Sequence, residues 1–320
     1  MINSLIVKYL PRTFDSFELE PNIVSLLRKA IEFDALNMLI ISNPGCGKTS
    51  LINVIVENYF CKHPKSAANI LRISSIKEQG ISYYRGDVRT FCQSLSSIPN
   101  KRKVVILDDL DLISEQSQQV FRNCIDKYNK NVHFIASCTN AQKVIESLQS
   151  RLISVQIPPL SRSSLSNIME RIVHSENIII SSDAYEYILD VSNGSARALI
   201  NYLEKMAILE RTITTETAYS LCTDISVHDY ESYLQSCYEN NLQEAIGKLY
   251  CIYSNGFSVM DVLSGLFRHL RNSKTFESNK LFEIIPLICK HIIAFSEIHE
   301  DKIELAFFTA NVLKVFQSIK

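Results

Sequence analysis

The stretch from Leu39 to Val56 constrains the fold of this chain more than any other. An apolar run, Met38 to Ile41, leads directly into a turn-rich loop and then into the start of a helix. In that arrangement the backbone N–H groups of the loop and the positive end of the helix dipole face the same point, which favours a polyphosphate. The pattern therefore predicts a phosphate-binding loop between a buried strand and a helix.

Three of the four fixed positions of the motif Gly-x-x-x-x-Gly-Lys-Ser/Thr are filled. Gly47 lets the backbone approach the phosphates, Lys48 reaches the outer two, and the Thr49 hydroxyl is placed to ligate Mg²⁺. Ser42 stands where the motif has its first glycine. The alternative is a simple turn followed by a solvated lysine, because so short a pattern also arises by chance. A second acidic motif on another buried strand separates these alternatives.

That second motif follows the apolar run Val104 to Leu107, which ends in Asp108-Asp109-Leu110-Asp111. A continuous apolar run suits a fully buried parallel strand, whose carboxyl end delivers its acids to a ligand crevice. Asp108 would hold Mg²⁺, and Asp109 would orient or deprotonate an attacking water. The alternative is a solvated acidic turn that caps the helix beginning near Ser114. The buried strand, the acidic residues at its end and the phosphate-binding loop together favour a nucleotide-binding site.

Strands alternate with helices as far as Pro158-Pro159, which predicts an α/β domain with a parallel sheet and its ligand at the strand carboxyl ends. After Pro159 helices dominate. We expect three domains: residues 1–158 form the nucleotide-binding α/β domain, residues 159–225 a small helical lid and residues 226–320 an all-helical block. The expected strands are Met38 to Ile41, Ile70 to Ile73, Val104 to Leu107, Val132 to Ser137 and Val155 to Ile157.

The composition is that of an ordinary globular protein, with 46% apolar and 21% charged residues and a net charge of −1. Any contact with nucleic acid must therefore be local or shared among subunits. No apolar run approaches the roughly 18 residues that cross a bilayer, so we expect no membrane segment. Nine cysteines are scattered without a Cys-x-x-Cys pair, which is typical of reduced thiols in an intracellular protein.

Several motifs, in order along the chain, resemble those of AAA+ clamp-loader subunits, and most closely the small subunits of replication factor C. Lys8-Tyr9-Leu10-Pro11 resembles the family's Lys-Tyr-Arg-Pro, and the acidic strand end resembles its Asp-Glu-Ala-Asp. The other matches are the phosphate loop, Ser74 to Ile81, Asn140 at the sensor-1 position, Leu148 to Arg151 at the Ser-Arg-Cys motif, Gly194 to Asn201 at the sensor-2 helix, and Tyr233 to Leu270 in the collar.

The resemblance implies an α/β P-loop AAA+ domain, a lid and an all-α collar, with Mg²⁺-ATP bound between the first two. Thr49 and Asp108 would hold the Mg²⁺. The implied nucleotide-binding residues are Ile6, Glu18, Ser42, Asn43, Pro44, Gly45, Cys46, Gly47, Lys48, Thr49, Ser50, Asn140 and Arg197.

The resemblance also assigns catalytic roles. Lys48, Asp108 and Asp109 would act in the chain's own site, where Asn140 would position the water or sense the γ-phosphate, unless it merely caps the following helix. Arg151 would project into a neighbour's ATP as an arginine finger. Arg151 and the lid's Arg197 could alternatively be ordinary surface arginines.

The resemblance also implies partners: other clamp-loader subunits in a hetero-oligomeric ring, a pentamer, together with a PCNA-like sliding clamp and primer-template DNA. It places the complex in the nucleus or, for a viral source, at a viral replication site. Lys77, Arg85 and Arg89 would contact DNA phosphates, or would form a solvated face. Apolar residues of the collar could form an oligomerisation surface or the collar's own core; they are Leu249, Ile252, Val259, Val262, Leu263 and Leu266.

Departures from the family's motifs bear on activity. Asp109 replaces the expected Glu, so its carboxylate lies about one methylene short of the water, and hydrolysis is expected to be slow. The leading function is an ATPase subunit that helps open a sliding clamp and load it on DNA in replication and repair. The alternative is a structural subunit that holds ATP, hydrolyses little and donates Arg151 to a neighbour. An initiator or a branch-migration motor is a third possibility, against which the helical, non-basic C-terminal block speaks.

Overall fold

The computed structural model describes residues 4–61, 63–64, 66–74, 81–209, 212–222, 225, 227–272, 278–295 and 300–318. By its internal contacts the chain divides into two compact units, Met1–Thr215 and Glu216–Lys320. The first unit contains both the predicted α/β domain and most of the predicted lid, so the three-domain boundaries remain a prediction. Nowhere in the described ranges does a helix reach the length and apolarity needed to cross a membrane.

A five-stranded parallel sheet organises the first unit, in the order β2-β3-β4-β1-β5. This confirms the predicted parallel α/β sheet. All five carboxyl ends meet at one edge, so the segments after β1, β3 and β4 are neighbours although they are far apart in sequence. The strands are β1 (Met38–Ile41), β2 (Ile70–Ser74), β3 (Lys103–Asp108), β4 (Val132–Cys138) and β5 (Ile153–Gln156).

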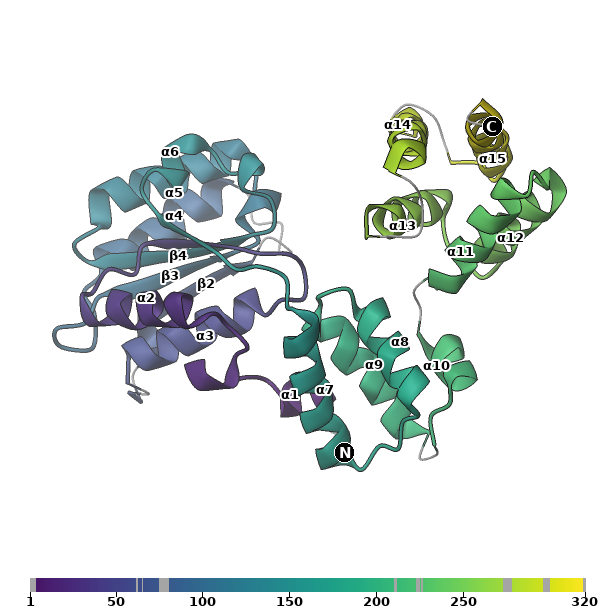
Figure 1. Ribbon diagram of the computed structural model, residues 1–320. Coiled ribbons are helices and arrows are strands. Elements are labelled where there is room, and N and C mark those ends of the chain that lie inside the picture. The colour runs from purple at the N-terminus through teal and green to yellow at the C-terminus, as the bar shows by residue number, and fades with distance from the viewer. Residues whose placement is uncertain are drawn as a thin grey trace. The chain divides into compact units, whose positions relative to one another are not determined.

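Helices cover both faces of the sheet, with α2 and α3 on one side and α4, α5 and α6 on the other (Figure 1). Successive residues of β1 point to opposite faces and belong to two apolar cores. Met38 and Ile40 pack in the core under α2 and α3, and Leu39 packs in the core under α4, α5 and α6. Burial on both faces explains why these strands are continuous apolar runs. The helices are α2 (Pro21–Glu32), α3 (Lys48–Tyr59), α4 (Ile81–Gln93), α5 (Glu115–Tyr128) and α6 (Glu146–Gln149), with short 3₁₀ turns at Phe14–Ser16, Ser66–Asn69, Leu110–Leu112 and Ala141–Lys143.

Within the first unit the predicted lid contains α7 (Arg162–Glu176), α8 (Ser182–Ser192) and α9 (Ala196–Ile208), which are called the lid below. Each begins at a serine whose hydroxyl accepts a bond from a backbone N–H of the first turn. The N-terminal helix α1 (Leu5–Lys8) packs on α9.

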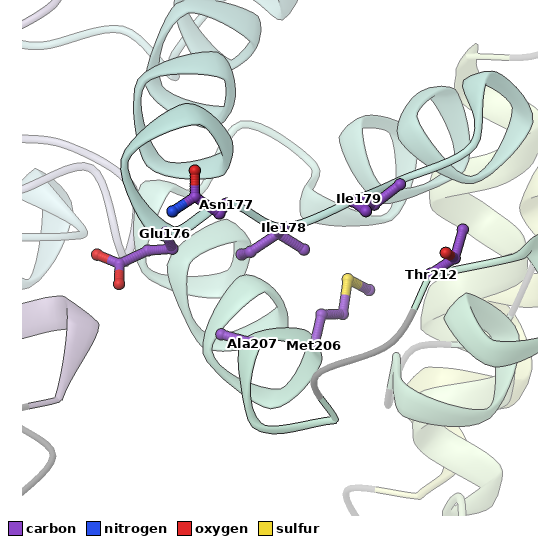
Figure 2. Close-up of a pocket in the computed structure, with 7 residues that line it drawn as sticks. All are labelled: Glu176, Asn177, Ile178, Ile179, Met206, Ala207 and Thr212. Carbon is purple, nitrogen blue, oxygen red and sulfur yellow. The ribbon is translucent and has the colours of Figure 1, made fainter.

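A cavity of about 350 Å³ lies within the lid between the ends of α7 and α9 (Figure 2). Lys and Arg are absent from the described residues that line it, so it does not suit a polyphosphate. In Figure 2 the carboxylate of Glu176 points away from Met206. That carboxylate instead accepts bonds from Lys8 Nζ, at 2.7 Å, and from the Tyr9 hydroxyl. The lining residues are Glu176, Asn177, Ile178, Ile179, Met206, Ala207 and Thr212.

Helices are the only regular secondary structure among the described residues of the second unit, which has a core of its own. The six collar residues considered for an oligomerisation surface, Leu249 to Leu266, are all buried in that core. The surface hypothesis is therefore wrong for these side chains, because the helices of the bundle itself cover them. The helices are α10 (Thr215–Leu221), which starts at the boundary, α11 (Val227–Tyr238), α12 (Leu242–Ser254), α13 (Val259–Asn272), α14 (Ser278–Ala294) and α15 (Ile303–Ser318).

Candidate nucleotide-binding site

The loop after β1 has the backbone of a phosphate cradle. Gly45 and Gly47 both adopt positive φ, at +81° and +87°, which an L side chain rarely adopts. Lys48 is buried, and its Nζ donates to the carbonyl oxygens of Ser42, at 2.9 Å, and Asn43, at 3.3 Å. The ammonium group therefore lies inside the curve of the loop, at the start of α3.

The lid touches this loop directly. A Cβ built on Gly45 would lie 2.0 Å from Ser195 Oγ, so only glycine fits the observed contact. The backbone N–H of Arg197 donates to the Gly45 carbonyl at 3.4 Å, and the Cys46 thiol lies 3.7 Å from the Gly194 carbonyl oxygen. The start of α9 thus sits on the phosphate loop, which brings the predicted sensor arginine, Arg197, to the same place.

Two oxygen groups that suit Mg²⁺ lie together beside the loop. Thr49 Oγ1 donates to Asp108 Oδ2 at 3.1 Å, although the two residues come from α3 and β3. The other oxygen of Asp108 accepts a bond of 2.5 Å from Ser137 Oγ, and the same hydroxyl accepts the N–H of Asp109 at 3.0 Å. Hydroxyl and carboxylate oxygens are hard donors of the kind that Mg²⁺ prefers. Ser137 was not predicted, because a serine inside an apolar strand carries no motif.

Asp109 occupies a strained turn at the end of β3. Its φ of +53° is uncommon for a non-glycine residue and is typical of functional turns. Burial raises the pKa of its carboxyl, and the neighbouring Asp108 raises it further, while Lys48 and Arg197 act in the opposite direction. The net shift is upward, which suits a group that must take a proton.

Asp111 organises the neighbouring strand end. Its Oδ2 accepts bonds from the backbone N–H groups of Thr139 and Asn140, both at 3.1 Å, and from the Thr139 hydroxyl at 2.5 Å. Burial raises the pKa of Asp111, but these bonds outweigh it and leave the pKa below its ordinary value. Asn140 Oδ1 accepts the N–H of Gln142 at 2.9 Å, so the helix-capping alternative for Asn140 is present in the structure.

A cavity of about 320 Å³ opens beside the loop, between the α/β layer and the lid. Of the predicted nucleotide-binding residues, Ile6, Glu18, Gly45, Cys46, Gly47, Thr49, Ser50 and Arg197 line it. The remaining lining residues most relevant to a nucleotide are the Tyr9 and Phe17 rings, which can wall a base, and the Arg171 guanidinium from α7. Sequence reasoning did not assign Arg171 to nucleotide contact. Tyr9 belongs to a motif that the sequence already marks, whereas Arg171 belongs to none.

Arg151 lies at the opposite edge of the sheet. It precedes β5 by two residues, and the first residue of β5, Ile153, pairs with Met38 at the start of β1. The phosphate loop begins after Ile41, at the other end of the same strand. Arg151 therefore cannot reach its own phosphate loop without crossing the length of the sheet.

The predicted DNA-contacting residues are only partly described. Lys77 lies outside the described residues. Arg85 lies on α4, but its side chain is outside what the structure describes. Arg89, on the same helix, is exposed.

Residues 38–159 match the model of the ATPase family associated with various cellular activities (AAA). The chain is 26% identical over 302 residues to the replication factor C small subunit of Thermofilum pendens, covering 93% of this chain and 92% of the relative. It is 30% identical over 225 residues to replication factor C subunit 5 of Mus musculus, covering 68% and 66%. This chain belongs to the replication factor C small-subunit family.

The RuvB Holliday junction branch migration motor of Thermotoga maritima has the same fold, with a TM-score of 0.53 over 75% of this chain and 85% of RuvB. At 17% sequence identity this likeness bears on the fold alone. Membership of the replication factor C family makes this chain a nucleotide-binding clamp-loader subunit with an AAA+ ATPase domain. The predicted family and the predicted function are confirmed.

Proposed function

We propose that this chain binds Mg²⁺-ATP in the 320 Å³ cavity and hydrolyses it slowly to help open a sliding clamp. The observation that carries the proposal is the 3.1 Å contact of Thr49 with Asp108 beside a phosphate loop on which the lid rests. Nucleotide and metal ligands are thereby assembled from three segments of the chain. The lid's contact with Gly45 links the bound nucleotide to lid position.

Each residue has a distinct task in this proposal. Bound Mg²⁺-ATP supplies the phosphoryl group and a cation that neutralises its developing charge. Lys48 holds the outer phosphates, and Thr49 and Asp108 hold the cation. Asp109, with its raised pKa, takes a proton from the attacking water, which Asn140 orients.

The shorter side chain of Asp109 limits the rate in the proposal. Asp replaces the family's Glu here, which sets the carboxylate back by about one methylene. A misplacement of about 1 Å can cost roughly a hundredfold in rate. Binding depends on Lys48, Thr49 and Asp108, which are all present, so affinity for Mg²⁺-ATP is retained.

Around the site we propose a hetero-oligomeric ring, a pentamer, which acts with a PCNA-like clamp on primer-template DNA. The exposed Arg89 on α4, with Arg85 and Lys77, would contact the DNA phosphates, and Arg151 would reach a neighbour's ATP. With a eukaryotic source the assembly works in the nucleus, and with a viral source at the site of viral replication.

The test is ATP hydrolysis by the chain alone and by the complex reconstituted with partner subunits, clamp and primed DNA. Asp109→Asn should lower turnover in the complex by about the share of this one site. If Asp109→Asn leaves turnover unchanged while Lys48→Ala impairs assembly, the chain is instead a structural ATP-holding subunit.

A further inference from the structure

The guanidinium of Arg151 is held by contacts from two helices. Its Nε donates to Asp126 Oδ1, on α5, at 2.5 Å. Its Nη1 donates to the Ser147 carbonyl oxygen, on α6, at 2.6 Å, and lies 3.4 Å from Ser150 Oγ. Within the described part of the chain, no bond to Nη2 accompanies these. Two of the three guanidinium nitrogens are thus anchored, and the third, Nη2, remains for an acceptor outside this chain.

A second arginine lies near Asp126. Its Oδ2 lies 3.8 Å from Nε of Arg122, one turn earlier on α5. The Arg122 Nε is buried and has no hydrogen-bond partner among the described residues. The Asp126 carboxylate therefore lies between two guanidinium groups, and each of its oxygens faces one of them.

Stability does not account for this arrangement. The Arg151 side chain is 31% exposed and that of Asp126 is 44% exposed, and ion pairs so open to water contribute little to folding. What the contacts do supply is order, because a long arginine side chain otherwise samples many rotamers. A finger that is ordered before the neighbour's ATP arrives does not lose that freedom at the moment of reaction.

We propose that Asp126 is a positioning residue for the arginine finger: it fixes the Arg151 guanidinium through Nε so that Nη2 meets the γ-phosphate of a neighbouring subunit's ATP. The inference rests on the proposed function, because it needs Arg151 to act on a neighbour. It requires Asp126 to orient Arg151 productively rather than to hold it away from the neighbour.

The test is hydrolysis at the neighbour's site in the reconstituted complex, with the phosphate-loop lysines of the other sites changed to alanine. Asp126→Asn should lower kcat at that site about tenfold and leave KM within about twofold, because orientation matters in the transition state. Asp126→Glu should restore part of the loss. Combined with Arg151→Ala, Asp126→Asn should have no further effect, because the two residues act through one group.

Glu115→Gln is the matched control, since it removes an exposed carboxylate from the same helix. It should leave kcat unchanged. An unchanged or raised kcat for Asp126→Asn would overturn the inference, the raised value indicating that Asp126 restrains the finger. If Arg151→Ala itself leaves hydrolysis at the neighbour unchanged, it is instead the proposed role of Arg151 that fails.

A measurement on the chain alone provides a second readout. In the wild type the Arg151 Nε–H should give a distinct NMR signal, assigned by its loss in Arg151→Lys. Asp126→Asn should shift that signal toward the free-arginine position while the melting temperature changes little. An unmoved signal would show that Asp126 does not order the guanidinium.

Discussion

The two edges of the sheet carry the two halves of the proposed ATPase site, and they are built differently. At the carboxyl edge the backbone sets the geometry: Gly45, Gly47 and Asp109 adopt positive φ, and Lys48 is buried among carbonyl oxygens. At the amino edge a partly exposed side chain, Arg151, is aimed by side-chain and carbonyl contacts. The backbone of the fold therefore sets the geometry of the chain's own candidate site, whereas the position of Arg151, the proposed contribution to a neighbour, depends on a few side-chain and carbonyl contacts.

Lys48→Ala should produce the largest change at the carboxyl edge. Removing a charge-assisted contact to phosphate should weaken ATP binding about a hundredfold. Titration of a fluorescent ATP analogue in Mg²⁺ would measure it. Affinity within threefold of the wild type would show that the loop is not the phosphate site.

Gly45→Ala comes next, because it tests whether the lid must touch the loop. The new methyl group would lie 2.0 Å from Ser195 Oγ on a backbone with φ of +81°. We expect about tenfold weaker ATP binding, and a loss of about 1–2 kcal/mol in the free energy of unfolding from the left-handed backbone alone. Gly247→Ala is the control, since its new methyl group would meet no atom within 4 Å. If the two variants bind ATP with equal affinity, the contact between the lid and the loop plays no part in ATP binding.

Asp109→Glu should have a smaller effect, of opposite sign. The longer side chain should raise turnover in the assembled complex about fivefold, because it restores the reach of the carboxylate. Single-turnover hydrolysis separates this from product release. An unchanged or lower rate would contradict the argument from side-chain length.

The pH dependence of turnover tests the same residue. Asp109 must be ionised to take a proton, and burial together with Asp108 raises its pKa. Turnover should therefore fall as the pH drops through that raised pKa, at a higher pH than for an ordinary aspartate. In a pH profile of kcat, an acid limb at or below the ordinary aspartate pKa would argue that Asp109 is not the base.

Arg151→Ala should have the smallest effect on this chain's own site. Because Arg151 lies at the opposite edge from the phosphate loop, its removal should change the chain's own ATP affinity by less than about twofold. Isothermal titration of the isolated chain would measure this. A larger loss would mean that the two edges are coupled within one subunit.

Much of the fold was predictable from local patterns. The strands at the phosphate loop and the acidic motif were placed within a residue or two, because strands buried on both faces are continuous apolar runs. The collar residues Leu249 to Leu266 show the limit of this reasoning. Their apolar pattern predicts burial but not the partner that covers them, and the partner turned out to be the bundle itself.

The residues of the candidate site likewise divide into those that a sequence motif marks and those that only the folded structure brings into place. Lys48, Thr49 and Asp108 are marked by motifs, because their chemistry needs a fixed spacing along the chain. Ser137, Arg171 and Asp126 belong to no motif. The hydrogen bonds of Ser137 to Asp108 and of Arg151 to Asp126 join residues that lie 29 and 25 positions apart in the chain. Their roles depend on distances that only the packed sheet and its helices define.

The sequence by itself determined the family, the parallel α/β fold and the phosphate loop, because each depends on residues close together in the chain. Only the tertiary structure decided that α9 rests on the loop at Gly45, that Ser137 orients Asp108, and that Asp126 holds Arg151 at the far edge. These are contacts between segments that the chain brings together only on folding, and no local pattern of residue types encodes them.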